Sequence, residues 1–160
     1  MSTESKNDAD AKLAELARTA KAQAQRVLDK LPLLGPVTWL MMQPGPGRHA
    51  FIADLEWRVM PPLVIDQAKL YMRDGMPLAF VTWAQLSEPV AARYRQAPHH
   101  LAPAEWRSGE QPWIIDLFAP FGGAQDVLKD LHSTFPGKTI RQLGAANESP
   151  AEVIEWKAPG

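Results

Sequence analysis

The sequence predicts an α+β fold in one domain, with an extra helix at the N-terminus. Three observations support this prediction. The apolar patterns follow the order helix, helix, strand, strand, helix, strand, helix, strand, strand. Asp74-Gly75 separates two strand-like segments, as in a tight β-hairpin. Residues 112–118 have a strand pattern that leads through a glycine-containing turn into a helical pattern at 124–135.

The composition excludes several classes of protein. The 160 residues are 46% apolar, which suits one folded domain, and the net charge of −1 argues against a protein that neutralises many nucleic-acid phosphates. The absence of cysteine excludes disulfides, thiolate metal sites and a thioester on an enzyme thiol. Zinc-binding histidine motifs, Walker loops and GxSxG elbows are also absent, so we predict no metal.

The sequence gives no sign of targeting or of membrane insertion. Residues 1–30 mix both charges and have no apolar core, unlike a secretory signal. The longest apolar run, 37–42, is far shorter than the roughly 20 residues of a membrane helix. We expect a cytoplasmic protein with no membrane span.

The N-terminal part is expected to be helical. Over 8–30, Asp8 or Asp10 is a suitable N-cap, and a thin apolar stripe follows. We treat 1–30 as a helical extension and 31–160 as the main domain. The proline- and glycine-containing segment 31–36 is expected to end the helix.

The central part combines a helix, a hairpin and a second helix. A shaped loop is expected at 43–49, followed by a helix over 51–60 that Pro61-Pro62 ends. Strands are expected at 69–73 and 77–84, and Ser87 is expected to cap a helix over 88–97.

The C-terminal part carries the most informative segment. A central strand at 112–118 continues through the turn 119–123 into a helix over 124–135. Two final strands, 138–143 and 152–157, are expected to form a hairpin.

Asp116 is the first candidate functional residue. Simple alternation places Trp113, Ile115 and Leu117 on one face of the strand, and Ile114, Asp116 and Phe118 on the other. Because both faces are apolar, an unpaired carboxylate there would cost several kcal/mol. Asp116 is therefore either a structural group tied to backbone amides or to an arginine, or a carboxylate that orients an imidazole or an amine.

The other candidates are the glycine turn and the histidines. Phe121, Gly122 and Gly123 open a helix, where free N–H groups suit a phosphate or a pantetheine amide, although such turns are also common structural elements. His49 follows a rigid loop and is the best candidate for an active imidazole. The pair His99-His100 and His132 are more consistent with surface positions.

Five segments together resemble the RTX toxin-activating lysine acyltransferases, of which the hemolysin-activating enzyme is the prototype. They read LGPVTWL (34–40), VMPPL (59–63), PLAFVTWAQLS (77–87), EWRSGEQPWIIDLFAPFGG (105–123) and FPGKTIR (135–141). The resemblance runs from about Leu34 to Trp156. It implies a fold like the GCN5-related N-acetyltransferases and a cytoplasmic homodimer. It also implies transfer of a fatty acyl chain from acyl carrier protein to internal lysines of an RTX protoxin, with no other cofactor.

The resemblance also implies a catalytic histidine and aspartate. The aspartate of the W-x-x-D-x-x-A-P-F-G block corresponds to Asp116. An ungapped match places the family histidine at Gly47, and His49 lies two residues further along. Either a rearranged loop brings His49 into this role, as general base or transient nucleophile, or the chain has lost its base. Phe121, Gly122 and Gly123 are the expected acyl-donor contacts.

The sequence is also compatible with two other functions. The chain could be a small-molecule N-acetyltransferase that uses acetyl-CoA, because the implied fold would serve that reaction. It could also be a dimeric binding module that holds an RTX-type partner without modifying it, which the glycine at position 47 favours.

Overall fold

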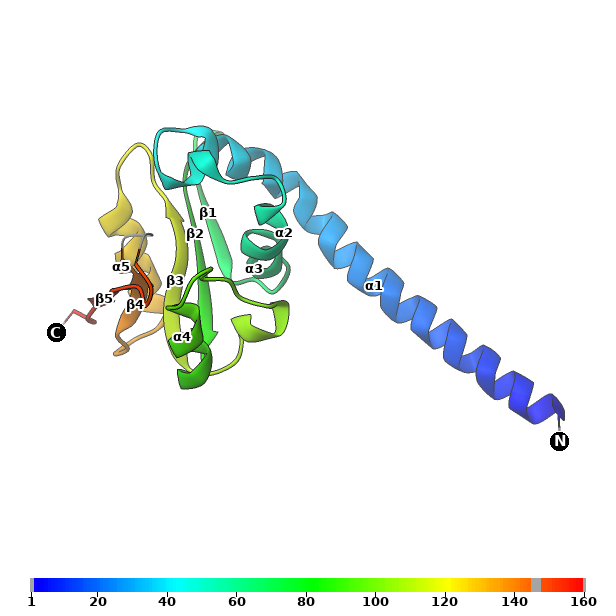
Figure 1. Cartoon of the computed structure of the whole chain (residues 1–160). Helices are drawn as coiled ribbons and strands as arrows, with labels where there is room; N and C mark the ends of the chain where they lie inside the picture. Colours follow the sequence, from blue (N-terminus) through cyan, green and yellow to red (C-terminus); the bar gives the residue numbers. More distant parts are fainter. Residues whose placement is uncertain (1, 145–147, 160) are drawn as a thin grey trace. The chain divides into compact units, whose positions relative to one another are not determined.

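The computed structural model describes residues 2–144 and 148–159. They form two compact units, one up to Leu34 and one from Gly35 onward. The second unit contains a five-stranded mixed sheet with helices on both faces, so the predicted α+β class is confirmed (Figure 1). Its elements are, in chain order, the end of α1 (Ser2–Met42), η1 (Pro46–His49), α2 (Asp54–Arg58), α3 (Met60–Val64), β1 (Ala68–Arg73), β2 (Met76–Leu86), α4 (Glu88–Tyr94), η2 (Pro103–Trp106), β3 (Gln111–Phe118), α5 (Ala124–Thr134), β4 (Ile140–Leu143) and β5 (Val153–Trp156).

The first helix is longer than predicted. Instead of ending near residue 30, α1 runs through the segment 31–36 and stops at Met42. Neither Pro32, Gly35 nor Pro36 breaks it. The prediction of a helix at 8–30 followed by a break was therefore wrong at its C-terminal end. It was also wrong at its start, because α1 begins at Ser2 and Asp8 and Asp10 lie inside the helix instead of capping it.

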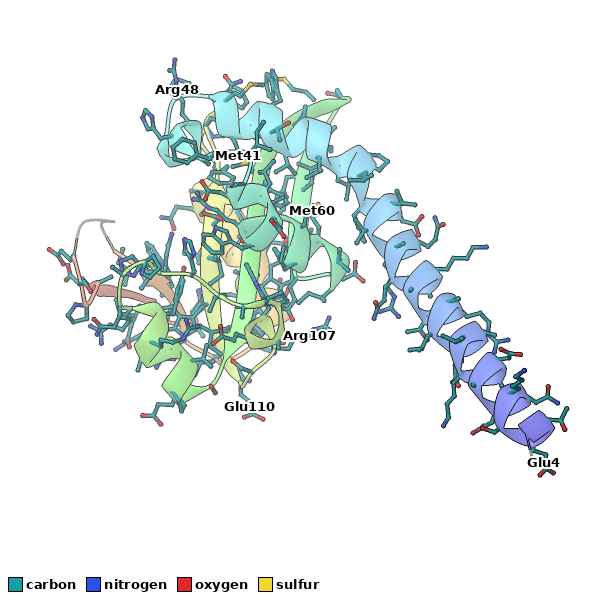
Figure 2. All side chains as sticks on the ribbon, turned by 45° about the vertical axis from the view of Figure 1, so that its right-hand side comes forward. Glu4, Met41, Arg48, Met60, Arg107 and Glu110 are labelled. Carbon is teal, nitrogen blue, oxygen red and sulfur yellow. The ribbon has the colours of Figure 1, made fainter. Side chains whose placement is uncertain are left out.

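Packing explains why α1 continues. Val37, Leu40 and Met41 recur at helical spacing and are all buried in the second unit; Met41 is labelled in Figure 2. Burying such a side chain contributes about 1.5–3 kcal/mol, so the three together contribute about 4.5–9 kcal/mol. This gain is of the same size as the roughly 7 kcal/mol that two interior prolines and one glycine cost. Local sequence signals indicated a stop that this packing overrides.

The segment after the loop forms two short helices rather than one. We predicted one helix over 51–60 that Pro61-Pro62 would end. Instead α2 ends at Arg58, and the two prolines lie in the first turn of α3. Proline fits that position because the first helical N–H groups have no partner within the helix.

The strands follow the order β1-β2-β3-β4-β5. All neighbouring pairs are antiparallel except β3 and β4, which are parallel. The predicted hairpin between β1 and β2 is confirmed, and Asp74 (φ 52°) and Gly75 (φ 75°) both adopt the left-handed conformation of a tight turn. The predicted pairing of the two final strands is also confirmed, while residues 145–147 between them lie outside the described residues.

Two apolar clusters occupy the two faces of the sheet. On one face α5 packs its buried side chains Val127, Leu128 and Leu131 against Val81 and Ile114. The other face carries a cluster that contains Tyr94 of α4, and α2 and α3 lie on this side in Figure 1. Ser87 caps α4 as predicted, because its hydroxyl accepts a hydrogen bond from the Val90 N–H.

A β-bulge changes which side chains of β3 share a face. Thr82 of β2 pairs with Asp116, but the next residue, Trp83, pairs with Ile114, so Ile115 is the extra residue. Ile114 and Leu117 therefore pack toward α5. The prediction from simple alternation was wrong, because it assumed an unbroken period of two.

None of the helices in the described ranges has both the length and the apolar character that crossing a membrane requires.

Candidate functional site

The candidate site lies where β3 and β4 separate. The two parallel strands pair only at Trp113 with Arg141 and at Ile114 with Gln142, and β3 then continues for four more residues. A cavity of about 530 Å³ opens beside this second half of β3. We call it the Asp116 pocket; its lining includes Trp57, Arg58, Tyr94, His99, Asp116 and Phe118.

Asp116 is held by a bidentate ion pair. Arg58 at the end of α2 donates from Nε to Oδ2 and from Nη2 to Oδ1, both at 2.6 Å. The Asp116 side chain is 6% exposed and that of Arg58 is 21% exposed. The backbone N–H of Asp116 donates to the hydroxyl of Thr82 at 3.1 Å. The carboxylate therefore has the arginine partner that the structural interpretation of Asp116 expected.

Burial and pairing act in opposite directions on this pair. Burial raises the pKa of the Asp116 carboxyl above its usual range, and the hydrogen bonds and charge of Arg58 oppose that rise. Burial acts to lower the pKa of Arg58, but the hydrogen bond to Asp116 and its charge outweigh burial and raise it. Burial and, to a smaller extent, Asp116 also raise the pKa of the Tyr94 hydroxyl, while Arg58 opposes this. Tyr94 therefore stays protonated at neutral pH.

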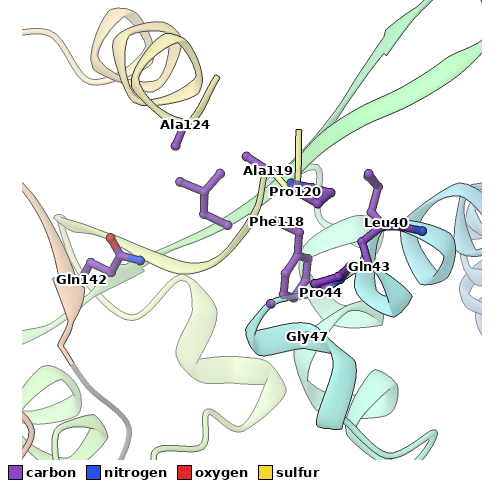
Figure 3. Close-up of a pocket in the computed structure, with 11 residues that line it drawn as sticks. Leu40, Gln43, Pro44, Gly47, Phe118, Ala119, Pro120, Ala124 and Gln142 are labelled. Atoms are coloured by element: carbon purple, nitrogen blue, oxygen red, sulfur yellow. The ribbon is translucent and has the colours of Figure 1, made fainter. Parts of the chain in front are cut away.

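A second, smaller cavity lies next to the first. Its volume is about 240 Å³, and Leu117, Phe118 and Gln142 line both cavities. Figure 3 shows Phe118 beside the loop that carries Gly47. We call this cavity the Gly47 pocket; its wall is formed by Leu40, Gln43, Pro44, Gly45, Gly47, Leu117, Phe118, Ala119, Pro120, Ala124 and Gln142.

Position 47 has no room for a side chain in this arrangement. A Cβ added to Gly47 would lie 2.8 Å from Cε1 of Phe118 and 3.2 Å from the Cα of Met41. Gly47 is buried between them. The loop is therefore packed around a glycine at the position that the resemblance matches to the family histidine.

His49 lies at the end of η1 with an exposed side chain and lines neither of the two pockets. Arg48, the residue before it, points away from the domain in Figure 2. Among the described contacts, the carboxylate of Asp116 is bound by Arg58 and not by His49. The predicted role of His49 stays a prediction.

His99 is the histidine that lines the Asp116 pocket. Its Nδ1 lies 2.9 Å from the carbonyl oxygen of Tyr94, which can only accept a hydrogen bond. Nδ1 therefore carries the proton, and Nε2 of the neutral ring keeps its lone pair. Its backbone is left-handed, with φ 60°. The neighbouring His100 instead stacks on Trp57, with ring centroids 4.1 Å apart.

Sequence reasoning missed Arg58 and His99. Arg58 is 58 positions before Asp116, and no local pattern links them. The polar residues around His99 predicted a surface loop, whereas His99 lines the Asp116 pocket. A folded backbone is needed to bring either residue to β3.

The glycine turn is positioned as expected, but its donor role stays a prediction. Gly122 (φ 91°) and Gly123 (φ 86°) are both left-handed, and Gly123 is the N-cap of α5. Phe121 is about half exposed and contacts Trp39, with ring centroids 5.7 Å apart. Ala119, Pro120 and Ala124, on either side of these three residues, line the Gly47 pocket.

The site also has a polar group that a ligand can satisfy. The indole Nε1–H of Trp57 is buried and has no hydrogen-bond partner among the described residues. Such a group costs free energy unless a water or a ligand accepts from it. No group of three or more His, Cys, Asp or Glu side chains within 2–144 and 148–159 is arranged to hold a metal ion.

Comparison with known proteins identifies the family. Residues 26–157 match the RTX toxin acyltransferase family. The leukotoxin-activating lysine-acyltransferase of Mannheimia haemolytica serotype A1 is 33% identical over 111 residues, which are 69% of this chain and 66% of that protein. The corresponding enzyme of Aggregatibacter actinomycetemcomitans is 34% identical over the same shares. The RTX-II toxin-activating lysine-acyltransferase of Actinobacillus pleuropneumoniae is 34% identical, covering 68% of this chain and 70% of the relative.

The chain thus spans about two thirds of the length of these relatives. The resemblance that the motifs indicated is confirmed, and it extends through both strands that form the Asp116 pocket. The chain belongs to the RTX toxin acyltransferase family.

Proposed function

We propose that this chain is a protein-lysine acyltransferase that moves a fatty acyl chain from acyl carrier protein to internal lysines of an RTX protoxin. Family membership supports the reaction class and the protoxin substrate. The single observation that carries the proposal is the buried Asp116–Arg58 ion pair in the wall of a 530 Å³ cavity. A buried charge pair beside an open cleft is typical of an active site.

The arrangement of β3 and β4 supports a fold like the GCN5-related N-acetyltransferases. The two strands are parallel, separate after Ile114, and leave a cleft between them. A bulge lies at Ile115, next to the point of separation. A thioester arm lying between the strands would place its carbonyl carbon near Asp116.

The two neighbouring pockets, which share part of their walls, suit the two substrates. The Gly47 pocket is lined mostly by apolar and small residues and lies beside the N-terminus of α5, which suits the acyl chain and pantetheine arm of the donor. The Asp116 pocket is charged and suits the acceptor lysine. Leu117, Phe118 and Gln142 belong to both, so an acyl group can meet an amine at their junction.

The reaction requires a base and a positive environment for the oxyanion. A lysine amine has a pKa near 10.4 in water and attacks only as the neutral amine. As the amine attacks, negative charge develops on the thioester oxygen. Arg58 supplies a fixed positive charge at this cavity, and Asp116 holds it in place.

The proposal includes three further elements that come from the resemblance alone. These are acyl carrier protein as the donor, a homodimer, and a cytoplasmic location. The assignments of Phe121, Gly122 and Gly123 to the donor and of His49 to the base also stay predictions.

A lysine-acylation assay tests the function. The purified chain is incubated with fatty acyl carrier protein and an unmodified leukotoxin, and the leukotoxin is mapped by mass spectrometry. We expect acyl-lysine with the wild type and a loss of about 100-fold or more with Asp116→Ala. Ser133→Ala, in an exposed turn of α5, is the control and is expected to be fully active.

The same assay separates the two other functions. Transfer from acetyl-CoA to a small amine, with no acylation of the leukotoxin, would indicate a small-molecule N-acetyltransferase. Stable binding of the leukotoxin with every lysine unmodified would indicate a binding module, and in that case Asp116→Ala would change no product.

A further inference from the structure

The site lacks an obvious proton acceptor in the place where the family resemblance puts one. Gly47 is enclosed by Phe118 and Met41, and a side chain there would collide with both. The carboxylate oxygens of Asp116 both accept from Arg58, and Tyr94 keeps its proton. A group elsewhere in the pocket must therefore take the proton from the acceptor amine.

The four histidines differ clearly in their positions. His49 is exposed at the end of η1, and His132 lies near the end of α5, on the opposite face of the sheet. His100 is stacked on Trp57. Within the part of the chain that the structure describes, His99 is the one that lines the Asp116 pocket.

His99 is also held in the tautomer that a base needs. The Tyr94 carbonyl oxygen lies 2.9 Å from Nδ1 and accepts a hydrogen bond from the Nδ1–H, so the lone pair of the neutral ring is on Nε2. This is the arrangement in which a backbone carbonyl orients a basic imidazole. His99 is half-buried and has a left-handed backbone in the wall of the pocket, and Arg58 and Asp116 are the charged residues that line the same pocket.

We propose that His99 is the general base of this chain, an assignment that rests on the lysine acyltransferase function proposed above. Nε2 of His99 takes a proton from the acceptor amine as the amine nitrogen forms a bond to the acyl carbon. The carbon–sulfur bond of the thioester then breaks, and the sulfur leaves as a thiolate. The imidazolium returns the proton to that sulfur. The products are an acyl-lysine and a free thiol, and the imidazole is neutral again.

The test uses a variant that keeps the local structure. Asparagine tolerates the left-handed backbone, and its amide can donate to the Tyr94 carbonyl, but it has no basic nitrogen. The full chain is assayed as His99→Asn with fatty acyl carrier protein and unmodified leukotoxin. His100→Ala is the matched control, His49→Ala tests the other histidine predicted as the base, and thermal unfolding verifies that each variant is folded.

We expect His99→Asn to lower the acylation rate about 100-fold or more, because a positioned base contributes a factor of that order. The donor KM and the unfolding temperature should change little, and the control His100→Ala should stay within about threefold of the wild type. His49→Ala should also stay in that range if His99, and not His49, is the base. In His99→Gly, which the left-handed backbone also accepts, added imidazole should restore part of the rate.

Three results overturn the assignment. One is full activity of His99→Asn, and another is loss of activity in His49→Ala with His99→Asn active. The third comes from ¹⁵N NMR of the wild type, if the neutral ring of His99 carries its proton on Nε2. A wild type that makes no acyl-lysine instead overturns the proposed function, and that result does not depend on any His99 variant.

Discussion

Arg58 and Asp116 meet through two hydrogen bonds of 2.6 Å although they lie 58 positions apart in the sequence. The pair joins the end of α2 to β3 at a position two residues after Ile114, the last residue of β3 that pairs with β4. It therefore ties a short helix with no buried residues of its own to the central strand of the sheet. The same contact places a positive charge in the wall of the cavity.

Removing the arginine should destabilise the domain. In Arg58→Met the Asp116 carboxylate stays buried without its partner, and breaking a buried pair in this way costs about 3–5 kcal/mol. Urea unfolding at neutral pH measures the loss. The double variant Arg58→Met/Asp116→Leu should recover most of the stability, because no buried charge is left. Equal loss in the single and double variants would contradict this explanation.

Filling position 47 should also destabilise the domain. The Cβ in Gly47→Ala would lie too close to Phe118, and overpacking of this kind costs about 1–3 kcal/mol. Adding Phe118→Leu should relieve part of the loss. The control is Gly35→Ala, which has open space in α1 and should stabilise the helix by up to about 1 kcal/mol. A neutral Gly47→Ala would show that the loop moves freely.

A histidine at position 47, where the resemblance implies one, should not raise the acylation rate, for the same steric reason. Gly47→His alone has to displace Phe118 and is expected to lower both stability and acylation rate. Gly47→His/Phe118→Ala makes room for the ring and should be more active than Gly47→His. If Gly47→His by itself exceeds the wild-type rate, position 47 is accessible to an imidazole after all.

The glycine turn before α5 should depend on backbone conformation rather than on space. Gly123 is left-handed, and no atom of the described residues lies within 4 Å of an added Cβ. Gly123→Ala should therefore cost about 1–2 kcal/mol, whereas Gly123→Asn should cost less because asparagine tolerates this conformation. Thermal unfolding compares the two. Similar losses for both would point to a steric role instead.

Acid should remove the contribution of one surface carboxylate. Hydrogen bonds from Lys69 and Tyr71, both at 2.6 Å, hold the pKa of Asp130 below its usual value. A depressed folded pKa stabilises the fold above the unfolded pKa of about 3.9, and this contribution disappears as the pH falls through the folded pKa. The free energies of unfolding of the wild type and Asp130→Asn should therefore differ at pH 7 and converge below about pH 4. A constant difference would exclude this linkage.

The segment from β3 through the turn to α5 is the part of the fold that the sequence predicted best. Apolar residues on both faces predicted a central strand, and the glycines predicted the left-handed turn; both predictions are confirmed. The same pattern predicted that the Asp116 side chain is buried, and this prediction is confirmed because the residue is 6% exposed.

The errors arose where tertiary contacts override local signals. Buried side chains at the end of α1 carry the helix through two prolines that predicted a stop. The bulge at Ile115 has no local signature, because isoleucine fits a regular strand equally well. His99 appeared to be a surface residue because only the folded chain shows the carbonyl and the cavity beside it.

The one additional residue in β3 decides which side of the sheet is reactive. If all eight residues of β3 alternated strictly, Asp116 would share the face of Ile114 and lie in the hydrocarbon layer beneath α5, away from its guanidinium. In this family member the chemistry of the cleft depends on an irregularity of the backbone as much as on the identity of any side chain. Insertions and deletions in that strand should be far less tolerated than substitutions.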